Sequence, residues 1–149
     1  MVTTTDSEDR IGRLVVDAAF TVHTHLGPGL LESIYEECFC HELNKRELRF
    51  QRQVKLPLIY DGINLDCALE LDVLVEDLVV CELKARPHHP IDMAQIISHL
   101  KLAQKQLGYL INFHVPLIKD GIRRVVVPTS PFLASPRLGG SIPVPPTTS

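Results

Sequence analysis

One stretch of the sequence, residues 71–84, restricts the fold most, because it places charges inside two apolar strands. Apolar residues fill most of the stretch, an acidic pair at 76–77 interrupts it, and this pattern predicts two strands joined by a turn. Three charged residues, Asp72, Glu82 and Lys84, lie within these strands or at their ends. A charge in a mostly buried strand is costly unless it is paired or binds a metal. The stretch therefore predicts a hairpin that carries a polar site.

The segment before this hairpin is predicted to form two helices. Thr5 and Glu8 have the spacing of a capping box, and the apolar residues that follow repeat at helical spacing over residues 6–25. The sequence Gly-Pro-Gly at 27–29 ends this first helix. A second helix is expected over residues 30–45, and its predicted inward side chains are Leu31, Ile34, Tyr35, Cys38 and Leu43.

The middle of the chain changes to the alternation of strands. One strand is predicted from Phe50 to Tyr60, followed by an Asp-Gly hairpin turn at 61–62. The returning strand places Ile63, Leu65, Cys67, Leu69, Leu71 and Val73 on one face. Together with a third strand over residues 78–85, these strands form an antiparallel meander.

The last third of the chain predicts a crossover. A third helix is expected over residues 91–107, ended by Gly108, with Gln95, His99 and Leu102 in one row. The short apolar run 109–113 is typical of a strand buried on both faces, and a helical connection makes it parallel to the third strand. Residues 122–127 are an expected edge strand. The fold class is thus α/β, in the order ααβββαβ(β), with a mixed sheet flanked by helices.

Length, charge and cysteine content narrow the functional class. We expect a single domain over residues 1–127 and a Pro-rich tail over 128–149. The net charge of −3 excludes a nonspecific nucleic-acid coat protein, which is usually basic. The polar N-terminus is not that of a signal peptide, and no apolar run is long enough to span a bilayer. The four cysteines lack metal-site spacing, so we expect buried free thiols in a reducing, cytoplasmic compartment.

Two carboxylates beside a lysine suggest metal-assisted hydrolysis. Asp72 and Glu82 supply the oxygen ligands that Mg²⁺ or Mn²⁺ prefers, and the backbone carbonyl of Leu83 is a candidate third ligand. Lys84 lies two residues from Glu82 and projects to the same side of the strand, where it is suited to orient a water or stabilise charge on a phosphate. A plain ion pair between Glu82 and Lys84 is the structural alternative. For Glu32, the alternative is a solvated charge at a helix start.

The register of the hairpin decides between these interpretations. A strict two-residue loop at 76–77 places Asp72 opposite Cys81, so that the two carboxylates face opposite sides of the sheet. A three-residue loop at 76–78 places Asp72 opposite Glu82. A bulge near Cys81, or ligation at a strand end where the chain bends, serves equally well. The metal hypothesis therefore predicts one of these three geometries.

Several blocks of sequence resemble one known family. Residues 29–35, Gly-Leu-Leu-Glu-Ser-Ile-Tyr, match the motif that names the GxxExxY proteins. Further matching blocks are Glu82-Leu83-Lys84-Ala85, Gln95, Leu110-Ile111-Asn112-Phe113 and the run from Pro116 to Ile122. The family is placed in the PD-(D/E)XK nuclease superfamily. The resemblance implies a restriction-endonuclease-like core, which agrees with the predicted order of elements.

The resemblance also implies roles for individual residues. Asp72, Glu82 and Lys84 match the aspartate and the E-x-K of the superfamily, Glu32 its acidic residue on the preceding helix, and Gln95 its glutamine on the following helix. The implied metal ligands are Asp72, Glu82, Glu32 and the Leu83 carbonyl. Tyr35 and His23 are expected to support the site through packing. The chain departs from the family pattern at Glu70 and at His99, where an aromatic residue is common.

The leading hypothesis is a nuclease that uses Mg²⁺ or Mn²⁺ to hydrolyse nucleic-acid phosphodiesters, with DNA favoured over RNA. Cutting duplex DNA often needs two sites, which favours a homodimer. The alternatives are a catalytically inactive nuclease-fold module for binding or assembly, and hydrolysis of a small phosphoester. The candidate nucleic-acid contacts are Arg86, His88, His89, Lys101 and Lys105, with Arg123 and Arg124 further along the chain. For each of them, a solvated surface charge is the alternative.

Overall fold

The computed structural model describes residues 2–129, and of residues 67 and 68 it describes the backbone alone. The elements follow one another as α1 (Asp6–Leu26), α2 (Glu32–Lys45), β1 (Phe50–Tyr60), β2 (Ile63–Val75), β3 (Val79–Lys84), α3 (Ile91–Ala103), β4 (Leu107–Asn112), the 3-10 helix η1 (Ile118–Gly121) and β5 (Ile122–Val126). The five strands form one sheet in the order β1-β2-β3-β4-β5. Strands β3 and β4 are parallel and all other neighbours are antiparallel, which confirms the predicted mixed sheet.

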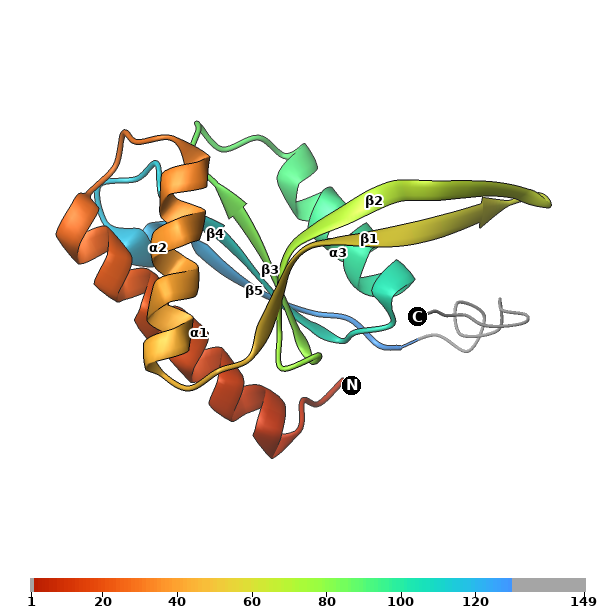
Figure 1. Cartoon of the computed structure of the whole chain (residues 1–149), viewed down its shortest axis with the longest axis horizontal. Coiled ribbons are helices and arrows are strands. Elements are labelled where there is room, and N and C mark those ends of the chain that lie inside the picture. Colours follow the sequence, from red (N-terminus) through yellow and green to blue (C-terminus); the bar gives the residue numbers. More distant parts are fainter. Residues whose placement is uncertain (1, 130–149) are drawn as a thin grey trace.

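The sheet lies between two layers of helices (Figure 1). Helices α1 and α2 cover one face, where their buried side chains pack on Val73, Cys81 and Leu83. Helix α3 covers the other face, where Ile96 and Leu100 pack on Val80 and Leu110. Strands β3 and β4 therefore have apolar neighbours on both faces, as the continuous apolar run 109–113 predicts for β4.

The first helix has the predicted start. The Glu8 backbone N–H donates to the Thr5 hydroxyl at 3.1 Å, and the Thr5 N–H donates to the Glu8 carboxylate at 2.8 Å. This capping box fixes the N-terminal end of α1, and Gly27 caps the other end. No described helix is long and apolar enough to cross a bilayer. Cys40 and Cys81 are buried free thiols as predicted, and Cys38 is a half-buried one.

Two expectations for the helices are wrong in detail. Leu31 is 71% exposed and Ile34 is 40% exposed, because α2 begins only at Glu32 and turns Tyr35, Phe39 and Leu43 inward instead. Helix α3 ends at Ala103 and not at 107, because Gln104 takes a left-handed conformation with φ 58° and caps the helix. Residues 107 and 108 then belong to β4, whose parallel ladder with β3 starts at the pair formed by Val79 and Leu107.

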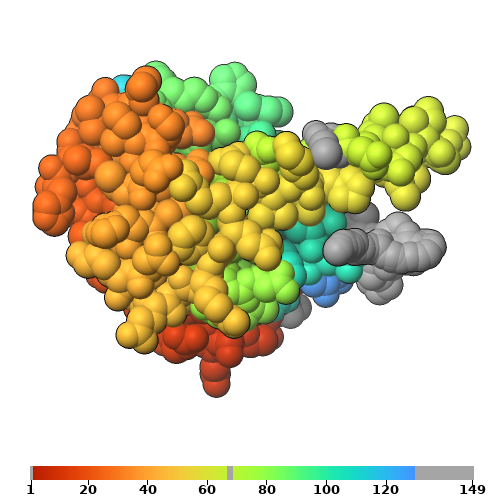
Figure 2. Space-filling model, viewed as in Figure 1, coloured from red at the N-terminus to blue at the C-terminus, as the bar shows by residue number. Residues whose placement is uncertain are grey.

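Strands β1 and β2 extend past the rest of the sheet as a long hairpin arm, which we define as residues 54–71. Figures 1 and 2 show this arm projecting beyond the helical layers. Its inner end packs on α3 through Val54 and Leu56. Its outer end exposes apolar side chains, including Tyr60 at 69% and Ile63 at 56%. The turn at 61–62 uses φ values of 47° and 80°, as expected of an Asp-Gly hairpin.

Gly121 is required by close packing under the loop that leaves β4. A Cβ at this position would lie 2.1 Å from the backbone carbonyl oxygen of Asn112, and a backbone atom cannot move aside cheaply. We expect Gly121→Ala to destabilise the protein by about 1–3 kcal/mol or more, as overpacking does in cores. Urea denaturation measures the effect. The exposed helical substitution Ser98→Ala is the control and should stay within about 0.5 kcal/mol of the wild type; a Gly121→Ala variant as stable as this control would contradict the assignment.

Candidate active site

The turn between β2 and β3 has the three-residue form. Val75 pairs with Val79, Leu74 with Val80 and Val73 with Cys81, so residues 76–78 form the loop. Glu76 and Asp77 take φ values of 52° and 55°, which make the tight reversal. When this register is continued by one residue, Asp72 lies opposite Glu82. The turn thus has one of the three geometries that the metal hypothesis allows, the three-residue loop.

The ladder between these strands stops where Asp72 begins to act as a hydrogen-bond acceptor. The last strand pair is Val73 with Cys81, and the backbone N–H of Leu83 then donates to Asp72 Oδ2 at 2.8 Å. A side-chain oxygen thus replaces the strand carbonyl that would continue the ladder. Asp72 therefore lies at a strand divergence, held by the backbone of the residue that follows Glu82.

Strands β1 and β2 both change faces at this point, at the base of the arm, which the sequence did not predict. Leu71 packs in the cluster under α3, whereas Val73 packs in the cluster under α1 and α2, although the two residues should share one face of a regular strand. The expected single face of β2 is therefore wrong at Asp72. On β1, the paired residues Arg52 and Val54 flank Gln53.

Gln53 supplies the physical reason for the change of face. Its φ of 52° is unusual for a residue that is not glycine, and it breaks the regular alternation of β1 directly across from Asp72. The Gln53 amide donates to both carboxylate oxygens of Glu36 at 2.9 and 3.1 Å, and Arg52 donates to the same carboxylate at 2.9 Å. Glu36 is 7% exposed, so this buried α2 carboxylate holds β1 in its twisted form.

Glu82 is the most deeply buried carboxylate of the site, with 2% of its surface exposed. Its Oε2 atom lies 3.1 Å from Nδ1 of His99, which is itself 4% exposed on α3. Sequence reasoning did not include His99 among the site residues. The sequence did carry a signal for His99, because this residue falls in one helical row with Gln95, four residues earlier on the same helix.

Lys84 emerges at the edge of the site, at the end of β3. Its Nζ atom donates to Gln95 Oε1 at 3.0 Å. The structure thus brings the predicted glutamine against the predicted lysine. No ion pair between Glu82 and Lys84 is found, and in the described part of the chain each has a partner on α3 instead.

The order of the elements and this constellation agree with a comparison against protein families. A model of the PD-(D/E)XK nuclease superfamily matches residues 9–125, from α1 into β5. The chain belongs to this superfamily. Searches of curated proteins and of solved structures found no match. The mixed sheet flanked by helices is consistent with the restriction-endonuclease-like fold of PD-(D/E)XK proteins.

Burial and like charge govern the electrostatics of the PD-(D/E)XK carboxylates. Burial, together with the negative charge of the neighbouring Glu82, raises the pKa of Asp72 to about 7, and the hydrogen bond from the Leu83 N–H opposes the rise. Glu32 adds a smaller rise and Lys84 a smaller decrease. Asp72 and Glu82 therefore share a region with more negative charge than the neighbouring protein groups neutralise.

Glu32 lies within electrostatic range of this pair but is not part of a compact cluster with it. Loss of water around its carboxylate raises the pKa of Glu32, and Lys84 opposes the rise. Among the described side chains, no three His, Cys, Asp or Glu residues are gathered closely enough to hold a metal ion. The structure thus provides a pair of carboxylates, with Glu32 on the first turn of α2 as a more distant acidic neighbour.

The predicted supporting residues have structural contacts. The Tyr35 hydroxyl donates to the Gly27 carbonyl at 2.5 Å and accepts from the Leu30 N–H at 3.2 Å, and its ring stacks on Phe113 with centroids 4.5 Å apart. These contacts fix the loop that leads to Glu32. His23 Nε2 lies 2.8 Å from the Val115 carbonyl oxygen.

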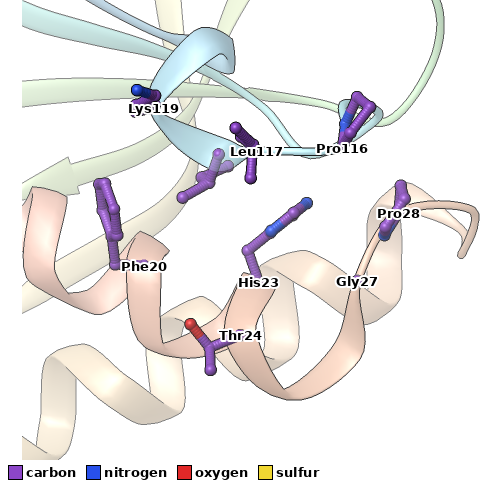
Figure 3. Close-up of a pocket in the computed structure, with 9 residues that line it drawn as sticks. Phe20, His23, Thr24, Gly27, Pro28, Pro116, Leu117 and Lys119 are labelled. Carbon is purple, nitrogen blue, oxygen red and sulfur yellow. The ribbon is translucent and has the colours of Figure 1, made fainter.

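His23 also lines a cavity of about 370 Å³ between α1 and the segment before η1. Figure 3 shows its ring rising from α1 toward the segment that carries Pro116 and Leu117. The walls of this cavity are mostly apolar and include none of Asp72, Glu82 and Lys84. Both His23 and the cavity thus belong to the packing of α1 rather than to the carboxylate pair.

The candidate nucleic-acid contacts have different positions. Arg86 lies two residues after Lys84, beside the site. Its guanidinium donates to the buried Asp92 carboxylate, with one contact at 3.1 Å. Its positive charge also opposes the rise in the pKa of Glu32. His88 and His89 are exposed in the next loop, and Lys101 is exposed near the end of α3. Lys105 lies 3.3 Å from Asp77, at the opposite end of β3 from Lys84. Arg123 is exposed on β5, and Arg124, also on β5, contacts Asp9 of α1 at 3.3 Å.

Proposed function

We propose that this PD-(D/E)XK protein is a metal-dependent nuclease that hydrolyses nucleic-acid phosphodiester bonds, and that it is a GxxExxY member of the superfamily. The motif at residues 29–35 supports the finer family assignment. The observation that carries the function is the pairing of Asp72 and Glu82 beside Lys84. PD-(D/E)XK nucleases generally use divalent metals such as Mg²⁺.

The donor set fits such a cation. Asp72 Oδ2 is occupied by the Leu83 N–H and Glu82 Oε2 by His99, and no described protein group donates to the other oxygen of either carboxylate. Two anchored carboxylates, each with one uncommitted oxygen, suit Mg²⁺, which binds through one or two carboxylates and keeps several waters. The raised pKa of Asp72 also indicates negative charge that a cation would neutralise. The ligands we assign are Asp72, Glu82 and the Leu83 carbonyl, with Glu32 acting through water.

Each residue has a distinct role in the reaction. A divalent cation at these oxygens supplies Lewis-acid polarisation of a phosphoryl oxygen. Lys84, held by Gln95 at the rim, places a positive charge where negative charge develops on the phosphate. Arg86, oriented by Asp92, is suited to contact a flanking phosphate, which gives affinity without reading the sequence.

Cleavage assays test this function. Labelled single- and double-stranded DNA and RNA are incubated with Mg²⁺ or Mn²⁺, using the wild type and Glu82→Gln. We expect cleavage of at least one substrate, preferentially DNA, abolished by EDTA and reduced at least about 100-fold in Glu82→Gln. Equal cleavage by both proteins would show a contaminant or a different site.

An inactive binding module is the second candidate, and the pairing of basic side chains favours it. Several cations that could meet a phosphate backbone contact carboxylates instead, among them Arg86 with Asp92, Lys105 with Asp77 and Arg124 with Asp9. Calorimetry with Mn²⁺ distinguishes the two candidates. Binding that Asp72→Ala removes supports the nuclease, whereas no heat of binding in the wild type supports the module.

A further inference from the structure

Two side chains of α3 meet two side chains of β3, and the geometry of both elements explains why. Gln95 and His99 are four residues apart, which is about 6 Å along an α-helix. Lys84 and Glu82 are two residues apart, which is about 6.6 Å along a strand. Because the two spacings nearly match, one helix face contacts both residues at once, Gln95 with Lys84 and His99 with Glu82.

We propose that His99 is a positioning residue that orients Glu82 for cation binding. This inference rests on the proposed function and adds a residue that the E-x-K and aspartate pattern does not contain. Nδ1 donates its hydrogen to Glu82 Oε2 and so fixes the rotation of the carboxylate. The other oxygen, Oε1, is then left for a cation, and Glu82 lies near enough to Asp72 for its charge to raise the pKa of that carboxyl.

The burial of both partners makes this hydrogen bond consequential. The side chains of His99 and Glu82 are 6% and 3% exposed, so water cannot readily replace the imidazole as donor. A buried carboxylate oxygen that loses its donor is left without a hydrogen-bond partner, and the carboxylate becomes free to rotate. Asp72 is held differently, by a backbone N–H that no side-chain substitution removes. Glu82 is therefore the ligand whose orientation depends on another side chain.

The surroundings of His99 support a positioning role over a purely apolar one. On either side along α3, Ile96 and Leu100 are buried in the cluster that packs α3 on the sheet, so the helix has apolar anchors of its own. A phenylalanine at 99 would supply similar bulk without a donor. The histidine thus contributes a hydrogen bond that packing does not require.

Two substitutions at this position separate bulk from hydrogen bonding. His99→Phe keeps a planar ring and removes the donor, whereas His99→Asn keeps a donor near the place of Nδ1. We expect the Mn²⁺ dissociation constant from calorimetry to rise about 10–100-fold in His99→Phe, the usual effect of removing a hydrogen bond to a metal ligand. His99→Asn should stay within about threefold of the wild type. The exposed neighbour Ser98→Ala is the matched control.

A second measurement tests the hydrogen bond in the metal-free protein. Nitrogen-15 NMR of the imidazole should show Nδ1 of His99 protonated, and Glu82→Gln should shift that resonance. If His99→Phe binds Mn²⁺ as tightly as the wild type, or if Nδ1 carries no proton, the positioning role is wrong although the nuclease proposal stands. If the wild type neither binds Mn²⁺ nor cleaves nucleic acid, the nuclease proposal fails and the positioning role fails with it. The expected result is weak Mn²⁺ binding in His99→Phe, restored in His99→Asn, with the Nδ1 proton present in the wild type.

Discussion

Asp72→Asn should make the metal-free protein more stable than the wild type at pH 8. Burial and Glu82 raise the pKa of Asp72 to about 7, well above the ordinary value of 3.8. Folding therefore favours the protonated carboxyl, and ionising it inside the fold costs free energy. Asparagine keeps an oxygen that can accept from the Leu83 N–H and removes the charge. The two pKa values correspond to a gain of at most about 4 kcal/mol.

The sign of the effect fixes its pH dependence. Below pH 3.8 the carboxyl is protonated in both the folded and the unfolded chain, so ionisation of Asp72 does not affect the free energy of unfolding. Between 3.8 and about 7 the folded protein retains a proton that the unfolded chain releases, and the wild type loses stability as the pH rises. The advantage of Asp72→Asn should thus be largest above pH 7 and vanish near pH 4.

Urea denaturation in EDTA, from pH 4 to pH 8, measures this difference in the free energy of unfolding. Asp66→Asn removes an exposed carboxylate of the same strand and should change stability by no more than about 0.5 kcal/mol at any pH. Mn²⁺ at 100 times its dissociation constant should then stabilise the wild type by about 2.7 kcal/mol and Asp72→Asn far less. A variant that is less stable than the wild type at pH 8 would show that the Asp72 charge is compensated in the fold.

Lys84→Met should abolish most cleavage while leaving cation binding intact. The methionine keeps much of the side-chain length and removes the charge that Gln95 holds at the rim. A single positioned charge or proton donor in a hydrolytic site is typically worth about 10²–10⁴ in rate, so kcat should fall by that factor. Lys84 lowers the pKa of Asp72, so without it the carboxylate pair is more negative, and Mn²⁺ affinity should be unchanged or higher.

Single-turnover cleavage and Mn²⁺ calorimetry on the same preparation separate these two effects. Lys45→Met is the matched control, because Lys45 is an exposed lysine at the end of α2 that contacts only Glu42 among described carboxylates. The control should cleave at the wild-type rate. Cleavage by Lys84→Met at that rate would falsify the role of Lys84, and a parallel loss of Mn²⁺ binding would mean that the lysine supports the fold of the site instead.

Local signals were sufficient to predict most of the architecture. The capping box at Thr5, the Asp-Gly turn and the apolar run of β4 each specify their element through short-range chemistry, and the structure has all three. The three-residue loop at 76–78 was one of the three geometries that a shared site for Asp72 and Glu82 allowed, and the chemical requirement excluded only the flat two-residue hairpin. Gln95 was assigned to the site because it matches the glutamine that the superfamily carries on the helix after the E-x-K strand.

What the sequence did not reveal depends on long-range contacts. The left-handed Gln53 has no glycine or turn residue to announce it, since its conformation is held by Glu36 on another element. The alternation of Leu69, Leu71 and Val73 continues across Asp72 in the sequence, although the chain changes faces there. The end of α3 was misplaced because Gly108 is the more obvious stop than Gln104. His99 was overlooked because its role requires knowing which strand residue faces it.

The change of face at Gln53 and Asp72 divides the β1–β2 hairpin into two parts that pack against different elements. The part next to β3 carries the carboxylate and is tied to α2 through Glu36, whereas the arm beyond it contacts α3 through a few apolar side chains near its base. The outermost residues, around Tyr60 and Ile63, contribute no group to the carboxylate pair. The tip of the arm can therefore be lengthened, shortened or replaced, in evolution or by engineering, without displacing the side chains of the candidate active site.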